Sequence, residues 1–487
     1  TSIELIRPLI SMSRTETGVF QLGFGEADRE ADEKSENAVG MMLDELSSPS
    51  DGSGSFSYLT RASVIGATLR VEDRMLGVSW GARHADITVE RAPIGLRATF
   101  DLDLGFKGTR PQIEGEAYFD KKNKSVDVAF SFDSIEPAKL AKEMDGLSPL
   151  NMLSTKLSGE GHLHFGPDGR VAPSEIKVSG TGGKLTLPGP NASSINFRKF
   201  TMEASIRRNP DQITIGNFEI ALPNGTATAK GIMTRVGDIG AISATLDVPT
   251  LPVNDLKKYW PLGQGGGARA WVTTNLREGT ISSATADLTA RLQIFGPKAG
   301  DFELDSVNGR FSVEGFEVDY LAPLPPITDA SATATFSETR FDFTVQKGSV
   351  GALSVADGTV NILNIGTPQV DLSVSTLVTG PVKDALAILN HPRLDLLTRV
   401  GLQTGKAQGS HATRLQISFP LLDDLRTKDV QISATSNVEG LALNEVIQGQ
   451  GIKETYMSLE LSNDWLHASG STLFADARTR FSWSEDF

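Results

Sequence analysis

Apolar and polar residues alternate with a period of two along most of this 487-residue chain. Successive side chains of a β-strand point to opposite faces of its sheet, so each such run predicts a strand with one apolar and one polar face. Antiparallel sheets with one face in water have this pattern. The clearest runs lie at residues 98–106, 126–132, 316–320, 341–345, 370–374, 415–419 and 457–461.

Turn signals separate these runs at short intervals, and helical spacing is rare. Pro223-Asn224-Gly225, Asn308-Gly309 and Asp357-Gly358 are typical of tight turns between strands. Many strands joined in this way predict a mainly β protein, a long antiparallel meander with a few short helices. The helices are expected at residues 35–46, 137–144, 254–259, where Asn254 would be the N-cap, and 381–389, which has a proline in its first turn.

Two stretches of distinct composition predict the domain organisation. Residues 26–36 form an acidic loop that leads into a short helix ending near residue 46. Residues 251–267 are rich in Pro and Gly and form a junction. We therefore expect a first β-segment over residues 1–250 and a second over residues 268–487, the latter with a short helix near 381–389.

Charge and motifs exclude several function classes. The net charge is −14 and no run of Lys or Arg is present, so nucleic-acid binding is not expected. There is no Cys, which excludes disulfides and thiol chemistry. The sequence has no hydrolase, zinc-protease or nucleotide-binding motif. No apolar stretch is long enough for a membrane-spanning helix, and residues 1–20 are not a signal peptide. We expect any anchor or export signal of the intact protein to lie outside this sequence.

Two local patterns resemble functional sites but have a simpler interpretation. Residues 180–184 (Gly-Thr-Gly-Gly-Lys) lack the hydroxyl residue of a phosphate loop and precede a strand-like run, so they predict a turn. Glu160, His162 and His164 would share one strand face and are the best metal candidates, but such a row is also typical of a solvated face. We expect no catalytic residues, no metal and no cofactor. One further hypothesis is an enzyme that acts on polysaccharides. Such an enzyme would need a cluster of acidic residues and aromatic side chains that stack on sugars, whereas the five Trp and five Tyr are scattered along this sequence.

The apolar strand faces must be covered by something. Two sheets can pack face to face as a sandwich, or one sheet can curl into a trough whose inner face is left for ligands. The alternation alone leaves both open. A trough would suit acyl chains, because a bare two-chain lipid would have to overcome on the order of 20 kcal/mol to cross water.

Several segments along the chain carry a family resemblance. They are similar to the YhdP-type branch of the AsmA-like superfamily of bacterial envelope proteins over nearly the full length. The segments are residues 65–73 before Trp80, 258–261 (Lys-Tyr-Trp-Pro), 268–271 (Ala-Arg-Ala-Trp) with Gly279, 307–311 through Tyr320, 323–327, Gly380-Pro381, and 481–487.

The resemblance implies both a fold and a function. The fold would be an elongated, curled β-groove in the periplasm, anchored in the inner membrane by an N-terminal helix absent from this sequence. The function would be phospholipid transfer between the inner and outer membranes, with acyl chains and the two membranes or their proteins as partners. The alternative is a structural scaffold that supports outer-membrane biogenesis by strand pairing at its edges.

The residues expected to line such a groove belong to three of the alternating runs. Inward and outward faces cannot be assigned from the pattern of one strand, because a slip of one residue inverts them. The candidates are Phe100, Leu102, Leu104, Phe130, Phe132, Phe341, Phe343 and Val345.

Overall fold

A computed structural model provides the coordinates of the chain. Internal contacts divide it into two units, unit 1 with Thr1–Leu246 and Leu288–Asp305, and unit 2 with Asp247–Asp287 and Ser306–Phe487. The structure describes residues 1–15, 20–24, 46, 58–74, 78–104, 111–143, 150–168, 171, 173–186, 194–208, 211–260, 266–294, 298, 300–392, 394, 406–422, 425–447 and 450–486.

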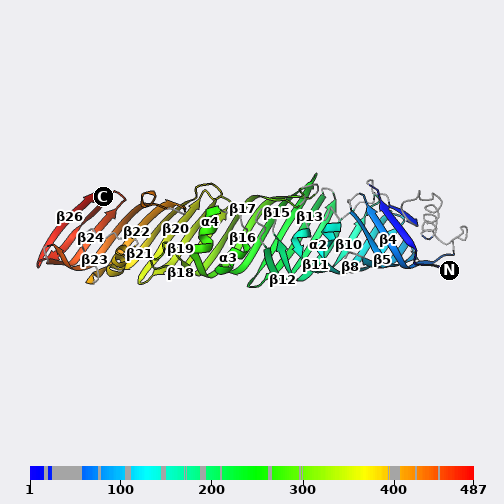
Figure 1. Ribbon diagram of the computed structural model, residues 1–487, viewed down its shortest axis with the longest axis horizontal. Coiled ribbons are helices and arrows are strands. Elements are labelled where there is room, and N and C mark those ends of the chain that lie inside the picture. Colours follow the sequence, from blue (N-terminus) through cyan, green and yellow to red (C-terminus); the bar gives the residue numbers. More distant parts are fainter. Residues whose placement is uncertain are drawn as a thin grey trace. The chain divides into compact units, whose positions relative to one another are not determined.

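The described residues of unit 1 form mostly long strands together with the short helix α2 (Pro137–Glu143) (Figure 1). Three further strands contribute residues to both units: β15 (Ile239–Pro252), β16 (Leu276–Gln293) and β17 (Phe302–Val318). The elements of unit 1 are β1 (Ser2–Ile6), β2 (Leu9–Arg14), β3 (Phe20–Phe24), β4 (Arg61–Asp73), β5 (Val78–Ala92), β6 (Gly95–Leu104), β7 (Gln112–Asp120), β8 (Ser125–Ile135), α2 (Pro137–Glu143), β9 (Leu153–Ser154), β10 (Leu157–Phe165), β11 (Ser174–Thr186), β12 (Ser194–Arg208), β13 (Asp211–Leu222) and β14 (Gly225–Val236).

Unit 2 has the same character, with its helices inserted between strands (Figure 1). Its elements are η2 (Val253–Asp255), α3 (Leu256–Tyr259), α4 (Gly266–Asn275), β18 (Ile327–Ser337), β19 (Arg340–Val350), β20 (Leu353–Leu363), β21 (Asp371–Pro381), α5 (Val382–Leu389), β22 (Gln408–Pro420), η5 (Thr427–Asp429), β23 (Gln431–Ile447), β24 (Gln450–Leu461), β25 (Trp465–Phe474) and β26 (Ala477–Asp486).

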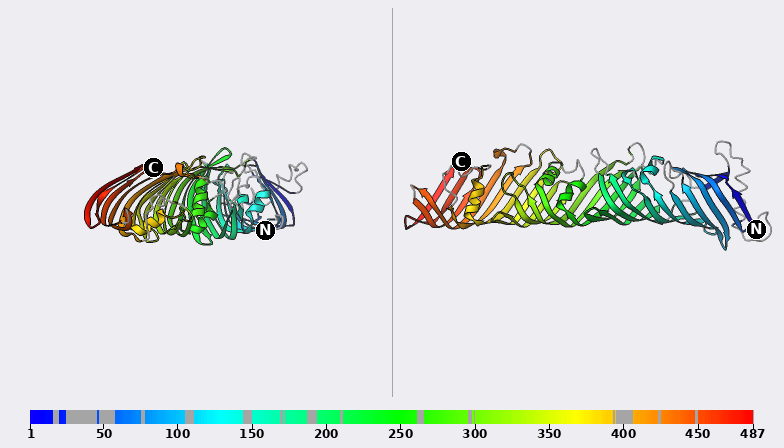
Figure 2. Two further views of the ribbon diagram at one scale, coloured as in Figure 1. Left: turned by 60° about the vertical axis from the view of Figure 1, so that its left-hand side comes forward. Right: turned by 60° about the horizontal axis from the view of Figure 1, so that its bottom comes forward.

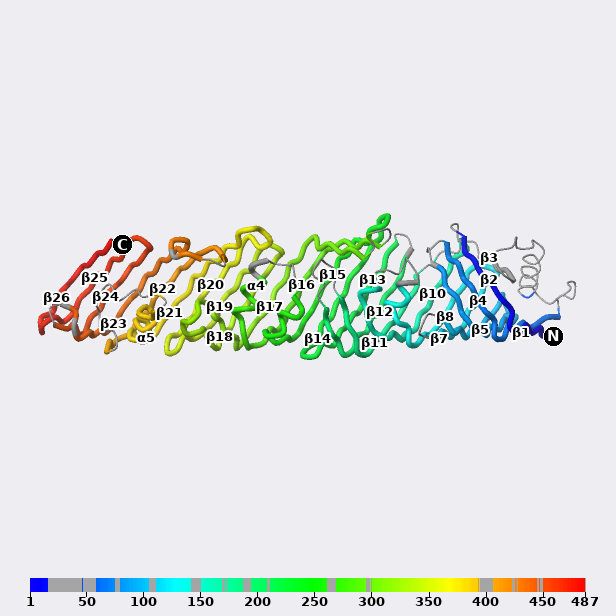
Figure 3. Tube along the Cα trace, viewed as in Figure 1, coloured from blue at the N-terminus to red at the C-terminus, as the bar shows by residue number. Residues whose placement is uncertain are grey.

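Strand pairing confirms the predicted mainly β meander within each unit. From β4 to β14 each strand pairs antiparallel with the next, except that the short β9 pairs with β11 and leaves β8 beside β10. From β17 to β26 the antiparallel order is unbroken. The Cα trace follows this up-and-down path (Figure 3).

The first strands depart from the predicted antiparallel order. β1 and β2 both pair parallel with β4, and β3 pairs antiparallel with β2, so the sheet is mixed. Parallel neighbours need a long connection between them. Here Ser2 pairs with Arg61, which is far from it in the sequence. The alternation within one strand cannot predict which distant strand it pairs with.

Bulges bend the long strands. Register shifts occur between Val64 and Ala67 and between Glu314 and Phe316, and the intervening Gly66 and Gly315 have φ of 65° and 66°. An extra residue at a bulge kinks the strand and increases its twist, and glycine adopts positive φ without a steric penalty. Figure 2 shows that the strands curve along their length.

A contact in unit 1 shows which way the sheet curls. The Cζ atom of Arg14 on β2 lies 5.6 Å from the ring centroid of Phe165 on β10. In a flat sheet these strands would be six spacings, or about 29 Å, apart. Arg14 shares a face with Ile10 and Leu69, and Phe165 lies opposite Val126 on the same apolar face. The sheet therefore curls with its apolar face inward.

Short helical segments pack on this inner face. In unit 2, Val253 and Leu256 contact the cluster of Val313 and Phe316, and Val382 of α5 packs in a second cluster on β22–β24. In unit 1, the helical residue Leu46 is fully buried. No helix in the described part of the chain has the length and apolarity needed to cross a membrane.

The predicted helices at 137–144 and 381–389 are confirmed to within a residue or two as α2 and α5. The helix predicted at 35–46 lies outside the described residues apart from Leu46. The prediction for 254–259 was right in place but wrong in its cap, because Pro252 precedes the helical turn and Asn254 makes no cap bond.

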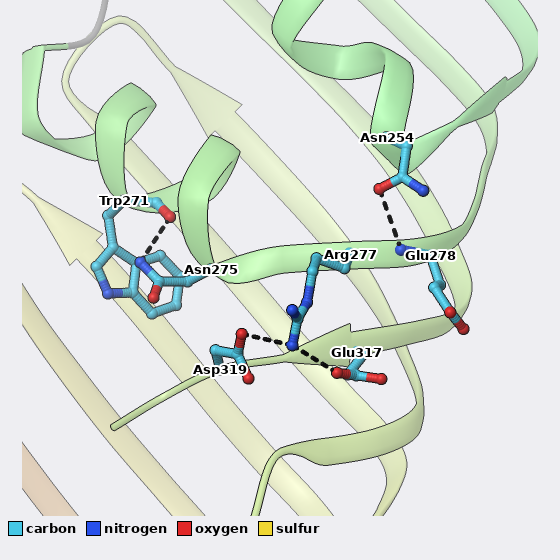
Figure 4. Close-up of polar contacts among 7 residues, drawn as sticks. All are labelled: Asn254, Trp271, Asn275, Arg277, Glu278, Glu317 and Asp319. Atoms are coloured by element: carbon cyan, nitrogen blue, oxygen red, sulfur yellow. Dashed lines mark hydrogen bonds and ion pairs between the residues drawn. The ribbon is translucent and has the colours of Figure 1, made fainter. Parts of the chain in front are cut away.

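Helix α4 was missed, because three glycines at 265–267 obscured its start. Polar bonds hold its C-terminal corner (Figure 4). The Asn275 side-chain amide donates to the Trp271 carbonyl at 2.9 Å. Arg277 donates to Glu317 and Asp319 at 2.7 and 2.5 Å. Asn254 accepts the Glu278 amide at 3.3 Å, so the residue predicted as a cap instead ties η2 to the start of β16.

The Arg14–Asp73 ion pair tests the inward curl of unit 1. Its N–O distance is 2.8 Å, and the two side chains are 3% and 13% exposed. Replacing Arg14 with Met removes the cation beside a buried carboxylate, so we expect a loss of about 3 kcal/mol. Hydrogen exchange should become faster in peptides from β2 and β4. The matched Arg97→Met variant, whose ion pair with Glu116 is exposed, should change little. Equal exchange in the two variants would contradict the inward placement of Arg14.

Candidate functional site

The cross-strand register of unit 1 joins the apolar side chains into continuous rows. Partners in an antiparallel pair lie on the same face, so a row can be followed from strand to strand. One row crosses nine strands without a polar side chain: Ile87, Phe100, Gly115, Phe130, Gly161, Ile176, Ala204, Ile215 and Gly231. The row beside it contains Ala85, Leu102, Ile113, Phe132, Gly159, Val178, Met202, Phe218 and Ala229.

Unit 2 has equivalent rows. One contains Phe311, Ala334, Phe343, Val360, Val374, Ile417 and Ile432. The rings of Phe311 and Phe343 lie 6.0 Å apart although β18 separates their strands, because the small Ala334 lets them lean together. The α3 helix covers part of this face, where Trp260 lies 5.8 Å from Phe341.

All eight predicted groove residues lie in these two inner faces. Leu102 and Leu104 are buried in the cluster with Ile10 and Leu69. The other six are half-buried. Phe100, Phe130 and Phe132 lie in unit 1, and Phe341, Phe343 and Val345 lie in unit 2. The register thus brings the first set together within one unit and the second set within the other.

The half-burial of the rings decides between the two coverings that the sequence left open. In the described part of unit 1, the apolar clusters consist of residues from neighbouring strands, Leu59 and Leu46, and contain no strand from an opposing sheet. The ring centroids of Phe130 and Phe132, which are neighbours on one face of β8, lie 6.3 Å apart. In the described residues, the apolar side chains therefore line the inner side of a curled sheet and do not pack against a second sheet.

The outer face carries the polar side chains. Asp86, Asp101 and Glu114 follow one another across three strands. Glu160, His162 and His164, the best metal candidates of the sequence, do share this face on β10, but His164 Nδ1 lies 2.6 Å from Asp127 Oδ1. No group of three potential ligands occurs among the described residues. This face is solvated, and it is hollowed where a cavity of about 620 Å³ is lined by Asp86, Asp101, Glu114, Glu160 and His162.

A short hydrogen-bonded chain of polar side chains, His411, Thr413 and Ser436, interrupts the apolar face of unit 2 near α5. His411 Nδ1 lies 2.8 Å from the Thr413 hydroxyl, which lies 2.8 Å from the Ser436 hydroxyl. His411 faces Val438 of the apolar cluster on β23. Burial lowers the pKa of His411 below its ordinary value of 6.5.

This burial predicts a pH dependence of stability. The unfolded chain takes up a proton at His411 as the pH falls below about 6.5, whereas the folded protein does so only at lower pH. The free energy of unfolding should therefore decrease in that range. Between about pH 7.5 and about pH 5.5, the urea midpoint should fall further in the unchanged protein than in His411→Gln. Parallel curves would mean that His411 titrates equally in both states.

Sequence reasoning missed the glycines of these rows. Gly115, Gly159 and Gly161 stand in line with phenylalanines on adjacent strands. Gly180 and Gly183, predicted as part of a turn, lie within β11, so that prediction was wrong. The available signal was the recurrence of Gly at alternate positions within predicted strands, which marks close approach of another group.

Comparison with known proteins places the chain in a family. No curated protein and no solved structure matches it. The sequence model described as YhdP protein matches residues 148–475, which is more than half of the chain. The match runs from the residues before β9 to the end of β25 and so includes parts of both units. The chain therefore belongs to the YhdP family.

Proposed function

We propose that this protein transfers phospholipid between the inner and outer membranes by carrying acyl chains along its apolar inner face. The YhdP family is a family of bacterial envelope proteins, and membership is consistent with lipid transport in the envelope. In this proposal the chain lies in the periplasm, and an N-terminal helix of the intact protein holds it at the inner membrane.

The observation that carries the proposal is the unbroken apolar row on a half-buried face of the sheet. The nine-strand row of unit 1 spans eight interstrand spacings, or about 38 Å. That exceeds the roughly 15 Å half-thickness of a bilayer hydrocarbon core. An extended acyl chain can therefore lie along the row without leaving apolar contact.

Burial of the chain supplies the driving force for occupancy. Each methylene moved from water to an apolar surface contributes about 0.8 kcal/mol, so a groove lowers the cost of crossing water. A charged headgroup stays hydrated at the open rim of the trough because its transfer to the apolar floor is costly. The row offers equivalent contacts at successive strands, so the lipid can slide with small changes in free energy. No residue acts as a catalyst in this mechanism.

A charge placed on the inner face tests the proposal. We expect the unchanged protein to co-purify with phospholipid, detected by mass spectrometry. Replacing Phe132 with Arg puts a cation on the floor of the groove and should reduce the bound lipid about tenfold or more, since a lone charge binds poorly to hydrocarbon.

The matched control is Ala129→Arg on the same strand. Ala129 lies on the outer face opposite Glu116, where an added cation meets acidic neighbours. This variant should retain the lipid of the unchanged protein. Equal lipid in Phe132→Arg and the unchanged protein would exclude this face as the binding site. A protein that carries no lipid, but binds unfolded outer-membrane proteins, would favour the assembly scaffold instead.

A further inference from the structure

Phenylalanine rings on the inner face lie over glycines of the adjacent strand. A Cβ atom added to Gly161 would lie 2.6 Å from Cζ of Phe130, and one added to Gly180 would lie 2.5 Å from Cε1 of Phe200. The same arrangement occurs four more times in the described residues: Phe100 over Gly115, Phe132 over Gly159, Phe197 over Gly183 and Phe336 over Gly309.

Only glycine permits this ring position. The distances from the added Cβ atoms are far shorter than the roughly 3.5–4.0 Å of carbon–carbon contact. A side chain at these positions would push the ring up from the sheet. A glycine inside a strand costs about 0.5–1 kcal/mol relative to alanine, so its repeated use under rings needs a compensating role. Covering the exposed backbone of the glycine with the ring is one such role.

The rings also determine how much space remains above the sheet. A phenylalanine that stands away from its strand fills the trough, whereas a ring lying along the sheet leaves the trough open. Phe130 and Phe132 are stacked at 25° to each other, and each has a glycine beneath it on β10. In this part of the inner face the rings therefore lie low and form a continuous surface.

We infer that the paired glycines, Gly161 and Gly180 foremost, are positioning residues that hold the rings on the floor and so set the clearance for a lipid acyl chain. The inference rests on the proposed function and adds its specificity-determining residues. Gly161 and Gly180 are the most informative pair members, because the nearest atoms to their added Cβ belong to a ring. At Gly115 and Gly159 a backbone carbonyl also stands in the way.

The test is binding of a phosphatidylethanolamine that carries a fluorophore on one acyl chain. In the full chain, Gly161→Ala should raise the ring of Phe130 and weaken binding about tenfold, the equivalent of roughly two methylenes kept in water. The double variant Gly161→Ala with Phe130→Leu removes the raised ring and should restore affinity. A role in strand stability alone would not give this rescue.

Gly216→Ala on β13 is the matched control, because nothing lies within 4 Å of its added Cβ. It should bind the probe as the unchanged protein does. Melting temperatures verify that each variant is folded, and the upfield ring-current shift of the Gly161 Hα protons, lost in Phe130→Leu, reports the ring position without lipid. If Gly161→Ala is folded and binds normally, or if Gly216→Ala weakens binding as much, this inference is wrong. Failure of the unchanged protein to bind the probe would overturn the proposed function, and this inference with it.

Discussion

Cross-strand register is the constraint on which the rest of this structure depends. An apolar row exists only if every strand presents the correct parity of side chains, and a one-residue slip would move a whole strand's apolar set to the outside. A β-bulge inserts one extra residue into a strand, so it could move the following side chains to the opposite face. At Gly66 and Gly315 the inserted residue has positive φ, and the apolar side chains on both sides of the bulge remain on the inner face. The bulges therefore bend the strands without breaking the rows.

The curl of the sheet determines how much of its apolar face is buried. The contact of Arg14 with Phe165 shows that unit 1 curls around its apolar side. A curled sheet shields part of that side with its own neighbours, which explains why Leu102 is buried while Phe130 on the same face is half-buried. The remaining cover comes from single helical turns such as α3, which occupy the face locally. Most of the apolar face in the described residues is therefore not covered by a second sheet, as it would be in a β-sandwich.

Local alternation predicted the strands and separated the apolar from the polar face of each strand, because side-chain parity is a local property; it did not determine which face is the inner one. Three features escaped it for physical reasons. The parallel pairing of β1 with β4 joins residues about sixty positions apart. Asn308-Gly309 and Asp357-Gly358 were predicted as turns but lie inside β17 and β20. Glycine there serves close packing under Phe336 and beside Val345, while Asp357 has the positive φ of a bulge. Composition does not separate these uses from chain reversal.

The half-buried apolar face poses an energetic problem that the fold alone does not solve, because its rings still contact water. Large exposed apolar patches on soluble proteins mark interaction sites. This protein had a simple alternative, since its polar outer face shows that strands of the same length can be well solvated, and Ser, Thr and charged residues fill that face from Asp86 to Glu203. Phenylalanine on the inner face is therefore unfavourable in water, and in the proposed function the rings would be fully buried when hydrocarbon lies above them. Under the same proposal, glycine beneath the ring would make room for that hydrocarbon, although glycine lowers the stability of the strand. Both costs fall on the same rows, and an acyl chain laid along a row would offset both.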